Sequence, residues 1–190
     1  MVIAGLLIVW ACPLTAGQQA SGEPRNARSL SAAALERTRH TVRYDGSYVR
    51  IPYPGGDVPA NTGVCTDEII RIFRQVGVDL QKEVHEDIVA HPNAYLSTQK
   101  PPDTNIDHRR VPNLSRFFRR RGESLPVTAR AEDYLPGDIV TWDLGGGVNH
   151  IGMVVDRYVW KRPMIVHNIG QGPKLENVLF AWRITGHFRY

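Results

Sequence analysis

Cys65 is the residue whose type and position most favour chemistry. It lies near the start of the segment VCTDEIIRIFRQVG, in which the apolar residues at 69, 70, 73 and 76 have the spacing of an amphipathic helix. Unpaired N–H groups at a helix N-terminus favour a thiolate and can hold an oxyanion. We therefore expect Cys65 to have a lowered thiol pKa and to act as a nucleophile. The alternative is a buried structural cysteine.

Two of the seven histidines lie in segments that alternate like strands, His150 in VNHIGMVV and His167 in PMIVHNIG. A cysteine nucleophile needs a group that takes its proton, and histidine is suited to this. Adjacent antiparallel strands would bring these two residues side by side. One would act as the base, and the other, or Asn168, would accept the hydrogen bond of its Nδ1. The alternative for His150 is a half-exposed strand histidine.

Metal chemistry has less support in the sequence. His85-Glu86 begins like a zincin motif, but the next histidine is His91, six residues on. That separation is about 600° around a helix, so the two rings point to different faces. A zinc site built from three histidines, at positions 108, 150 and 167, has no support from spacing. We predict no metal and no cofactor.

The first cysteine, Cys12, lies in the opening segment MVIAGLLIVWACPLTAG. Its apolar run of about ten residues is too short to cross a bilayer, which takes roughly 20. It fits a signal peptide over residues 1–17, although no Lys or Arg precedes it. Ala11 before Cys12 also permits a lipoprotein leader, and a buried N-terminal element is the alternative. Export to the periplasm or cell envelope would leave Cys65 without a disulfide partner.

Composition limits the class of protein. With 190 residues, 42% of them hydrophobic and 22% charged, the chain fits one globular domain. The net charge is +4, with arginines gathered between residues 109 and 121, but motifs for nucleic-acid binding are missing. We expect no nucleic-acid partner, a monomer, and membrane contact only through a lipid at Cys12. A mildly basic exported protein would be attracted to anionic wall polymers.

The order of elements predicts an α+β domain over residues 31–190, after a flexible linker at 18–30. Helices are expected from a cap at Ser31, from Cys65 to a stop at Gly77, over 79–90 and over 112–122. A short extended piece is expected near residues 48–51, before a structured loop. A hairpin through the glycines at 145–147, a strand in PMIVHNIG, and one or two more from VLFAW and ITGHFRY would then form an antiparallel sheet.

Three blocks of the sequence resemble a known family. GVCTDEII, PGDIVTWDLGGGVNHIGMVVD and MIVHNIG are similar to the Cys, His and His blocks of NlpC-type cysteine peptidases, the papain-like enzymes of bacterial cell-wall turnover. From residue 53 to 190, the patterns YPGGDVP, GVC, NIDHRRVPNL and HNIG resemble an exported bacterial family of unknown function in the same papain-like group, the DUF1287-type proteins related to YijF.

The resemblance implies a papain-like core in which a helix with the nucleophile packs on an antiparallel sheet with the histidines. It implies that Cys65 is the nucleophile, His150 the base and His167 the orienting residue. Tyr53 falls near a tyrosine that lines the NlpC-type site and donates to the oxyanion. A packed loop aromatic is the alternative for Tyr53.

Two departures from the NlpC pattern concern substrate recognition. Val64, Thr66 and Asp67 stand where those enzymes have Asp before the cysteine and Ser-Gly after it. We therefore carry over no substrate preference, and Asp67 becomes a candidate substrate contact. The long segment before His150 offers further candidates for one wall of the cleft, with an arginine suited to a substrate carboxylate: Asn105, Asp107, His108 and Arg109. The alternative is a loop held by its own Asp–Arg hydrogen bonds.

The function expected from the sequence is thiol-dependent cleavage of an amide in peptidoglycan stem peptides or cross-links. Papain-like acyl transfer is one alternative. A non-catalytic envelope or wall-binding protein is the other, although it would not need the Cys, His and His set.

Overall fold

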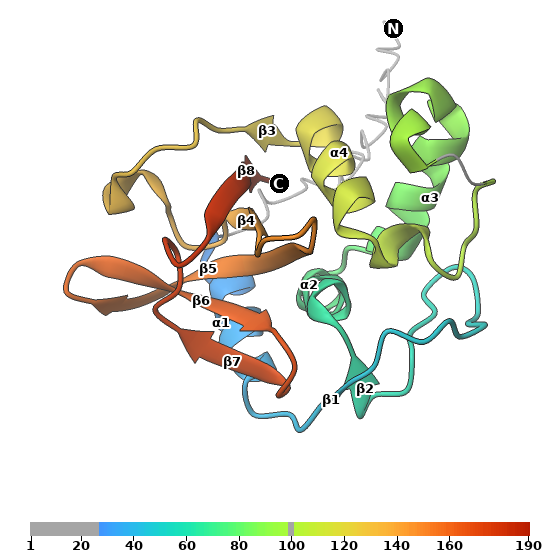
Figure 1. Cartoon of the computed structure of the whole chain (residues 1–190). Coiled ribbons are helices and arrows are strands. Elements are labelled where there is room, and N and C mark those ends of the chain that lie inside the picture. Colours follow the sequence, from blue (N-terminus) through green and yellow to red (C-terminus); the bar gives the residue numbers. More distant parts are fainter. Residues whose placement is uncertain (1–26, 99–100) are drawn as a thin grey trace, which may run out of the picture.

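The computed structural model describes residues 27–98 and 101–190 of the chain, and Figure 1 shows its elements. The predicted leader, with Cys12 and its candidate lipid anchor, lies outside the described residues, as does most of the predicted linker. In the described ranges, no helix has both the length and the apolar character that crossing a membrane requires.

Four α-helices precede most of the sheet in the described part of the chain, as the sequence predicts. They are α1 (Ala27–Arg37), α2 (Cys65–Gln75), α3 (Leu80–Ala90) and α4 (Val111–Arg121). The start of α1 differs from the prediction, because the helix begins before Ser31, inside the range predicted as linker. Ser31 is not a cap: it is buried in mid-helix, where its hydroxyl bonds to Asp156.

The ends of the other helices follow local signals in the sequence. Asp79 caps α3 by accepting hydrogen bonds from the backbone N–H groups of Gln81 and Lys82. Gly77, just past α2, has a φ of 81°, a value that favours glycine. Pro112 lies in the first turn of α4, where its missing N–H costs no hydrogen bond.

Six strands form one sheet in the order β3-β8-β4-β5-β6-β7, and every neighbouring pair is antiparallel. Their bounds are β3 (Glu123–Ser124), β4 (Ile139–Asp143), β5 (Asn149–Val159), β6 (Arg162–Asn168), β7 (Pro173–Glu176) and β8 (Arg183–Arg189). A separate parallel pair joins β1 (Arg43–Tyr44) to β2 (Thr62–Gly63). Short 3₁₀ helices cover Pro92–Thr98, Asp107–Arg109 and Ala131–Asp133.

Three details of the predicted extended segments are wrong. VLFAW forms turns rather than a strand, because its side chains pack against the back of the sheet, with Leu179 buried there. The strand β7 was not predicted, since its four residues, PKLE, carry little apolar alternation. Residues 48–51 form no strand.

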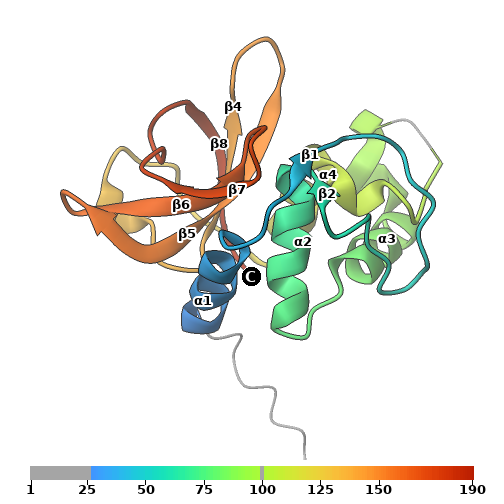
Figure 2. The ribbon, with the colours of Figure 1, turned by 90° about the horizontal axis from the view of Figure 1, so that it is seen from below.

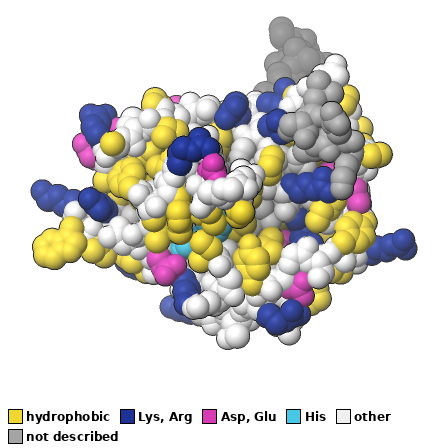
Figure 3. All heavy atoms as spheres, viewed as in Figure 1, with side chains coloured by type: hydrophobic (Ala, Val, Ile, Leu, Met, Phe, Trp, Pro, Cys, Tyr) yellow, Lys and Arg dark blue, Asp and Glu magenta, His cyan; other side chains and the backbone are white. Residues whose placement is uncertain are grey.

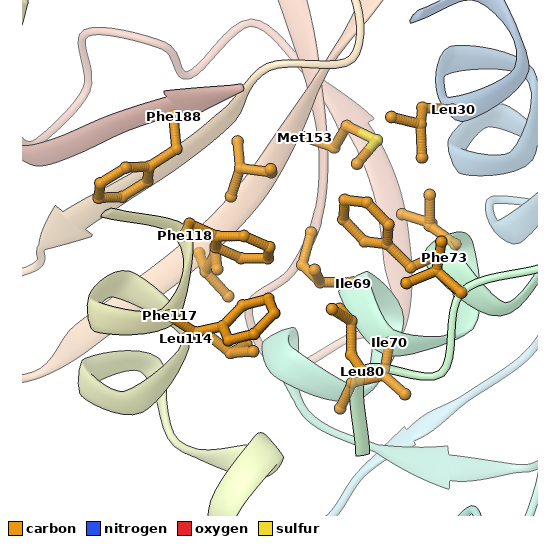
Figure 4. Close-up of a cluster of buried hydrophobic side chains, with 14 of the residues drawn as sticks. Leu30, Ile69, Ile70, Phe73, Leu80, Leu114, Phe117, Phe118, Met153 and Phe188 are labelled. Atoms are coloured by element: carbon orange, nitrogen blue, oxygen red, sulfur yellow. The ribbon is translucent and has the colours of Figure 1, made fainter. Parts of the chain in front are cut away.

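The helices and the sheet enclose the main core (Figures 1 and 2). Helices α1, α2 and α4 pack against β5, so that Ile69, Phe73 and Phe118 meet Met153 from the sheet (Figure 4). A smaller core covers the opposite face of the sheet, with Trp142 at its centre. Because side chains alternate along a strand, each buried strand supplies both cores.

Gly152 of β5 is required by the close approach of β6. A Cβ at this position would lie 2.7 Å from Cγ2 of Ile165 and 3.1 Å from Cβ of His167. We predict that Gly152→Ala lowers the free energy of unfolding by about 1–3 kcal/mol, the usual cost of overpacking. Urea denaturation measures this. Gly46→Ala is the control, because its nearest contact would be 3.6 Å away, and equal stability of the two variants would contradict the prediction.

Candidate functional site

The N-terminus of α2 holds Cys65 against the sheet. The residue is 5% exposed and belongs to the main core, while α2 packs on β5 and β6. Backbone N–H groups of Ile151, Thr66 and Cys65 itself lie close enough to the sulfur to lower the pKa of the thiol. Ile151 directly follows His150 on β5, so the sulfur lies at the start of the strand that carries the expected base.

The expected lowering of the Cys65 pKa is wrong for this structure. Burial raises the pKa of the thiol to about 11, and the backbone N–H groups oppose this shift only in part. The free-energy cost of burying a thiolate in a low-dielectric interior exceeds the stabilisation that these N–H groups supply. The resting residue is therefore a neutral thiol, and a reaction of its sulfur needs a base that removes the proton during attack.

His150 and His167 lie side by side on β5 and β6, as expected. Nε2 of His150 is 2.8 Å from Nδ1 of His167, and Nε2 of His167 is 2.8 Å from Oε2 of Glu176 on β7. The sequence analysis expected the first bond at Nδ1 of the base, but the structure forms it at Nε2. The three side chains make a continuous chain of hydrogen bonds across three neighbouring strands.

The carboxylate of Glu176 determines which nitrogen of each histidine carries a proton. A carboxylate only accepts, so Nε2 of His167 must donate to Glu176. Nδ1 of a neutral His167 then has a lone pair and accepts the proton of Nε2 of His150. The lone pair of a neutral His150 is therefore at Nδ1, for which the described residues supply no hydrogen-bond partner. This nitrogen is free to take a proton.

Aromatic side chains enclose the two histidines. The ring of Trp182 lies 6.0 Å from that of His150 and 6.1 Å from that of His167, and the tilted ring of Trp142 lies 5.8 Å from that of His150. Burial, together with the charge of His167, lowers the pKa of His150 to about 3. Burial also lowers the pKa of His167, against the opposing effect of Glu176. Both rings are neutral at pH 7. A histidine surface is visible between hydrophobic side chains in Figure 3.

A tyrosine does lie beside the thiol, but it is Tyr44 of β1 rather than Tyr53. Tyr53 packs on α3, 5.3 Å from the ring of His85 and hydrogen bonded to Glu86. The pairing of β1 with β2 brings Tyr44 next to Cys65. Burial, the charges of Cys65 and Asp67, and a hydrogen bond with the Cys65 side chain raise the pKa of Tyr44 to about 12. Its hydroxyl therefore remains a donor at neutral pH.

Asp67 and Arg109, both candidate substrate contacts, are joined to each other inside the protein. Each side chain is 2% exposed, and the guanidinium donates to both carboxylate oxygens at 2.8 and 3.1 Å. Asp67 also accepts from the backbone N–H of Val64 at 2.7 Å. Arg109 donates to the carbonyl of Ser47, and its own carbonyl accepts from the hydroxyl of Thr66. These bonds fix the loop around the cysteine.

Of the other candidates for the cleft wall, Asn105 and Asp107 have internal partners, whereas Nδ1 of His108 is buried without a hydrogen-bond partner among the described residues. Asn105 bonds to Asp103, and Asp107 accepts from Nδ1 of His85 at 2.9 Å. His108 is buried, which lowers its pKa to about 3. Asn105 is held within its own loop, but the Asp–Arg bond of the alternative does not form there, because Asp107 and Arg109 bond to His85 of α3 and Asp67 of α2 rather than to each other.

Asn168 lies next to His167 on β6 and points away from the histidine chain. Its amide donates to the carbonyl of Gly63 at 3.4 Å, which joins the end of β6 to the loop before Cys65. Within residues 27–98 and 101–190, no group of three or more His, Cys, Asp and Glu side chains is placed to hold a metal ion.

Two members of the site, Glu176 and Tyr44, were not identified from the sequence. Glu176 lies in the strand that was not predicted, and its side chain is 40% exposed, so nothing distinguishes it from a surface carboxylate. Tyr44 stands 21 residues before Cys65, and only a two-residue bridge brings it close. The signal that could have identified Glu176 is its place shortly after the PMIVHNIG strand, where a short returning strand would lie beside His167.

The tautomers and pKa values of the histidine chain can be measured directly. We predict that His150 is protonated at Nε2 alone and remains neutral down to about pH 4, because its pKa is lowered to about 3. Two-dimensional ¹⁵N NMR of the imidazole nitrogens between pH 8 and pH 4 would show this. Exposed His40 serves as the internal reference. A His150 midpoint near 6.5, or a proton on Nδ1, would contradict the assignment.

Comparison with known proteins identifies the family. Residues 31–190 match a domain of unknown function, DUF1287. The chain is 46% identical over 165 residues to the uncharacterized protein YijF of Escherichia coli (strain K12), an alignment that covers 85% of this chain and 80% of that protein. The chain belongs to the DUF1287 family.

Proposed function

We propose that this protein is a papain-like hydrolase that cleaves an amide by attack of Cys65. The observation that carries the proposal is the His150–His167–Glu176 chain, which leaves a lone pair at Nδ1 of His150, the residue before Ile151, whose backbone lies near the sulfur. A nucleophile, a base and an orienting group in this order are the requirements of covalent catalysis.

The first half-reaction starts from a neutral pair. As the Cys65 sulfur bonds to the substrate carbonyl carbon, its proton passes to Nδ1 of His150 and the carbonyl oxygen becomes an oxyanion. The hydroxyl of Tyr44 is the side-chain donor next to the sulfur, and its raised pKa keeps it protonated. The positive charge that forms on His150 is stabilised through His167 by the carboxylate of Glu176.

Departure of the amine completes the first half-reaction, and attack by water then returns the protein to its starting state. Nδ1–H of His150 protonates the amine as the carbon–nitrogen bond breaks, which leaves a thioester on Cys65. Nδ1 then takes a proton from water while the hydroxide adds to the thioester carbon. Collapse releases the carboxylic acid and restores the thiol, so atoms and charge balance without a further reactant.

The substrate class that we propose is the amide bonds of peptidoglycan stem peptides or a similar envelope amide. The apolar leader pattern of residues 2–11 favours export, and the net charge of +4 favours association with anionic wall polymers. Both features support a site of action in the periplasm or cell envelope.

The central test is the dependence of cleavage on Cys65. We predict that the purified protein releases new amine and carboxylate ends from whole peptidoglycan and that Cys65→Ala releases none above background. Mass spectrometry of the soluble fragments gives the bond that is cut. The variant must retain the circular dichroism spectrum of the parent. Transfer of the acyl group to an added amine would indicate acyl transfer, and the absence of any Cys65-dependent product would indicate a non-catalytic protein.

Glu176→Gln tests the positioning role of the carboxylate. A glutamine amide can donate to Nε2 of His167, which moves the ring proton to Nδ1 and removes the acceptor for His150. We predict a fall in kcat of about 10²-fold or more with little change in KM, by analogy with the loss of an orienting carboxylate in serine peptidases. Glu176→Asp should restore part of the rate, and Lys174→Gln, on the same strand, is the control. An unchanged kcat would exclude this role.

A further inference from the structure

A small basic pocket opens between α4 and the edge of the sheet. It has a volume of about 200 Å³, and its walls come from the first turns of α4, the start of β5 and the strand β8. The lining residues are Pro112, Ser115, Arg116, Arg119, Asn149 and Thr185. We call it the α4 pocket.

Both walls of the α4 pocket lead to Cys65. On the sheet side, Asn149 lies two residues before Ile151, whose N–H bonds to the sulfur. Residues two apart on a strand face the same side and are separated by roughly 7 Å. On the helix side, α4 begins just after Arg109, whose carbonyl accepts from Thr66, the neighbour of Cys65. The pocket is therefore next to the proposed site of attack.

The charge of the pocket is not neutralised from within. Arg116 and Arg119 are three residues apart on α4 and so share one face of the helix. No Asp or Glu lines the pocket, and no described carboxylate forms a salt bridge with either arginine. By contrast, Arg120 of the same helix pairs with Asp87 at 2.9 Å.

Arg116 also carries an unsatisfied donor. Its Nη1 is buried and has no hydrogen-bond partner among the described residues. A buried donor without a partner costs about 1–3 kcal/mol, so a movement of the Arg116 side chain that brings this nitrogen to an acceptor in the pocket would recover a bond that the free protein lacks. Guanidinium groups match a planar carboxylate with two parallel donors.

We infer that the α4 pocket binds a carboxylate of the substrate, so that the protein selects acidic peptides. This inference rests on the proposed function for its location beside the cleaved bond. Arg116 and Arg119 bind the carboxylate, and the amide of Asn149 and the hydroxyl of Ser115 supply further polar contacts. The sequence analysis assigned this role to Arg109, but Asp67 already occupies that guanidinium.

The test measures binding separately from cleavage. Stem peptides released from peptidoglycan are used with free carboxylates or after chemical conversion of the carboxylates to amides. Isothermal titration calorimetry with the Cys65→Ala protein gives both dissociation constants. We expect the acidic peptides to bind about tenfold or more tightly, the size of effect typical of hydrogen bonds to charged groups. The preference should weaken as salt is added.

Variants of α4 assign the preference to the pocket. Arg116→Gln should remove it, Arg116→Lys should keep part of it, and Arg121→Gln should leave it unchanged, because Arg121 lies on the same helix but outside the pocket. Circular dichroism verifies that each variant folds. Equal binding of the two peptides, binding of neither, or a preference that survives Arg116→Gln would overturn the inference.

The cleavage assay keeps the two proposals distinguishable. Cys65-dependent cleavage of acidic and amidated peptides at equal kcat/KM would leave the hydrolase in place and overturn the carboxylate subsite. An Arg116-dependent binding preference without any cleavage would support the subsite and overturn the hydrolase.

Discussion

The buried carboxylate of Asp67 is the interaction on which the arrangement of the site depends. It accepts the N–H of Val64 and both nitrogens of the Arg109 fork, and each partner in this pair is almost wholly shielded from water. Removal of one partner from such a pair typically costs about 3–5 kcal/mol, because the other charge is left buried and unpaired. Through Ser47 and Thr66, the same pair joins three distant segments of chain around Cys65.

The helical layer and the sheet contribute different parts of the chemistry. The helical layer presents the sulfur at the N-terminus of α2, where backbone N–H groups lie nearby. The sheet presents the two histidines and Glu176, because antiparallel pairing of β5, β6 and β7 places one polar side chain of each strand in a row. The same packing excludes water and keeps the thiol and the imidazoles uncharged. The site therefore holds no thiolate–imidazolium ion pair at rest, and under the proposed function Glu176 would stabilise charge only when it forms during the reaction.

Elements with strong local signals were predictable from the sequence. The spacing of Ile69 and Phe73 predicts α2, the glycine at 77 predicts its end, and the expected helix over 79–90 agrees with α3, since helix ends depend on neighbours in the chain. The meeting of His150 and His167 was also predictable, because adjacent antiparallel strands leave few registers that bury both.

Features that depend on distant contacts were not predictable. Tyr44 reaches Cys65 only through a two-residue parallel bridge. The pKa of Cys65 depends on how deeply the whole fold buries the sulfur, and a helix N-terminus alone predicts the opposite shift. Arg109 and Arg116 look alike in the sequence, and only the fold shows that one is paired inside the protein and the other has a donor to spare.

Glu176 orients the two histidines from a partly exposed position, so it influences their hydrogen bonds without being part of the hydrophobic core. Its side chain is 40% exposed, whereas the two histidines that it orients are buried. A cation, a change in ionic strength or a substitution at this solvent-facing edge therefore reaches the interior through two hydrogen bonds without disturbing the hydrophobic packing. Proteins of this architecture can therefore vary the surroundings of the two histidines through surface changes alone, at little expense to their folding.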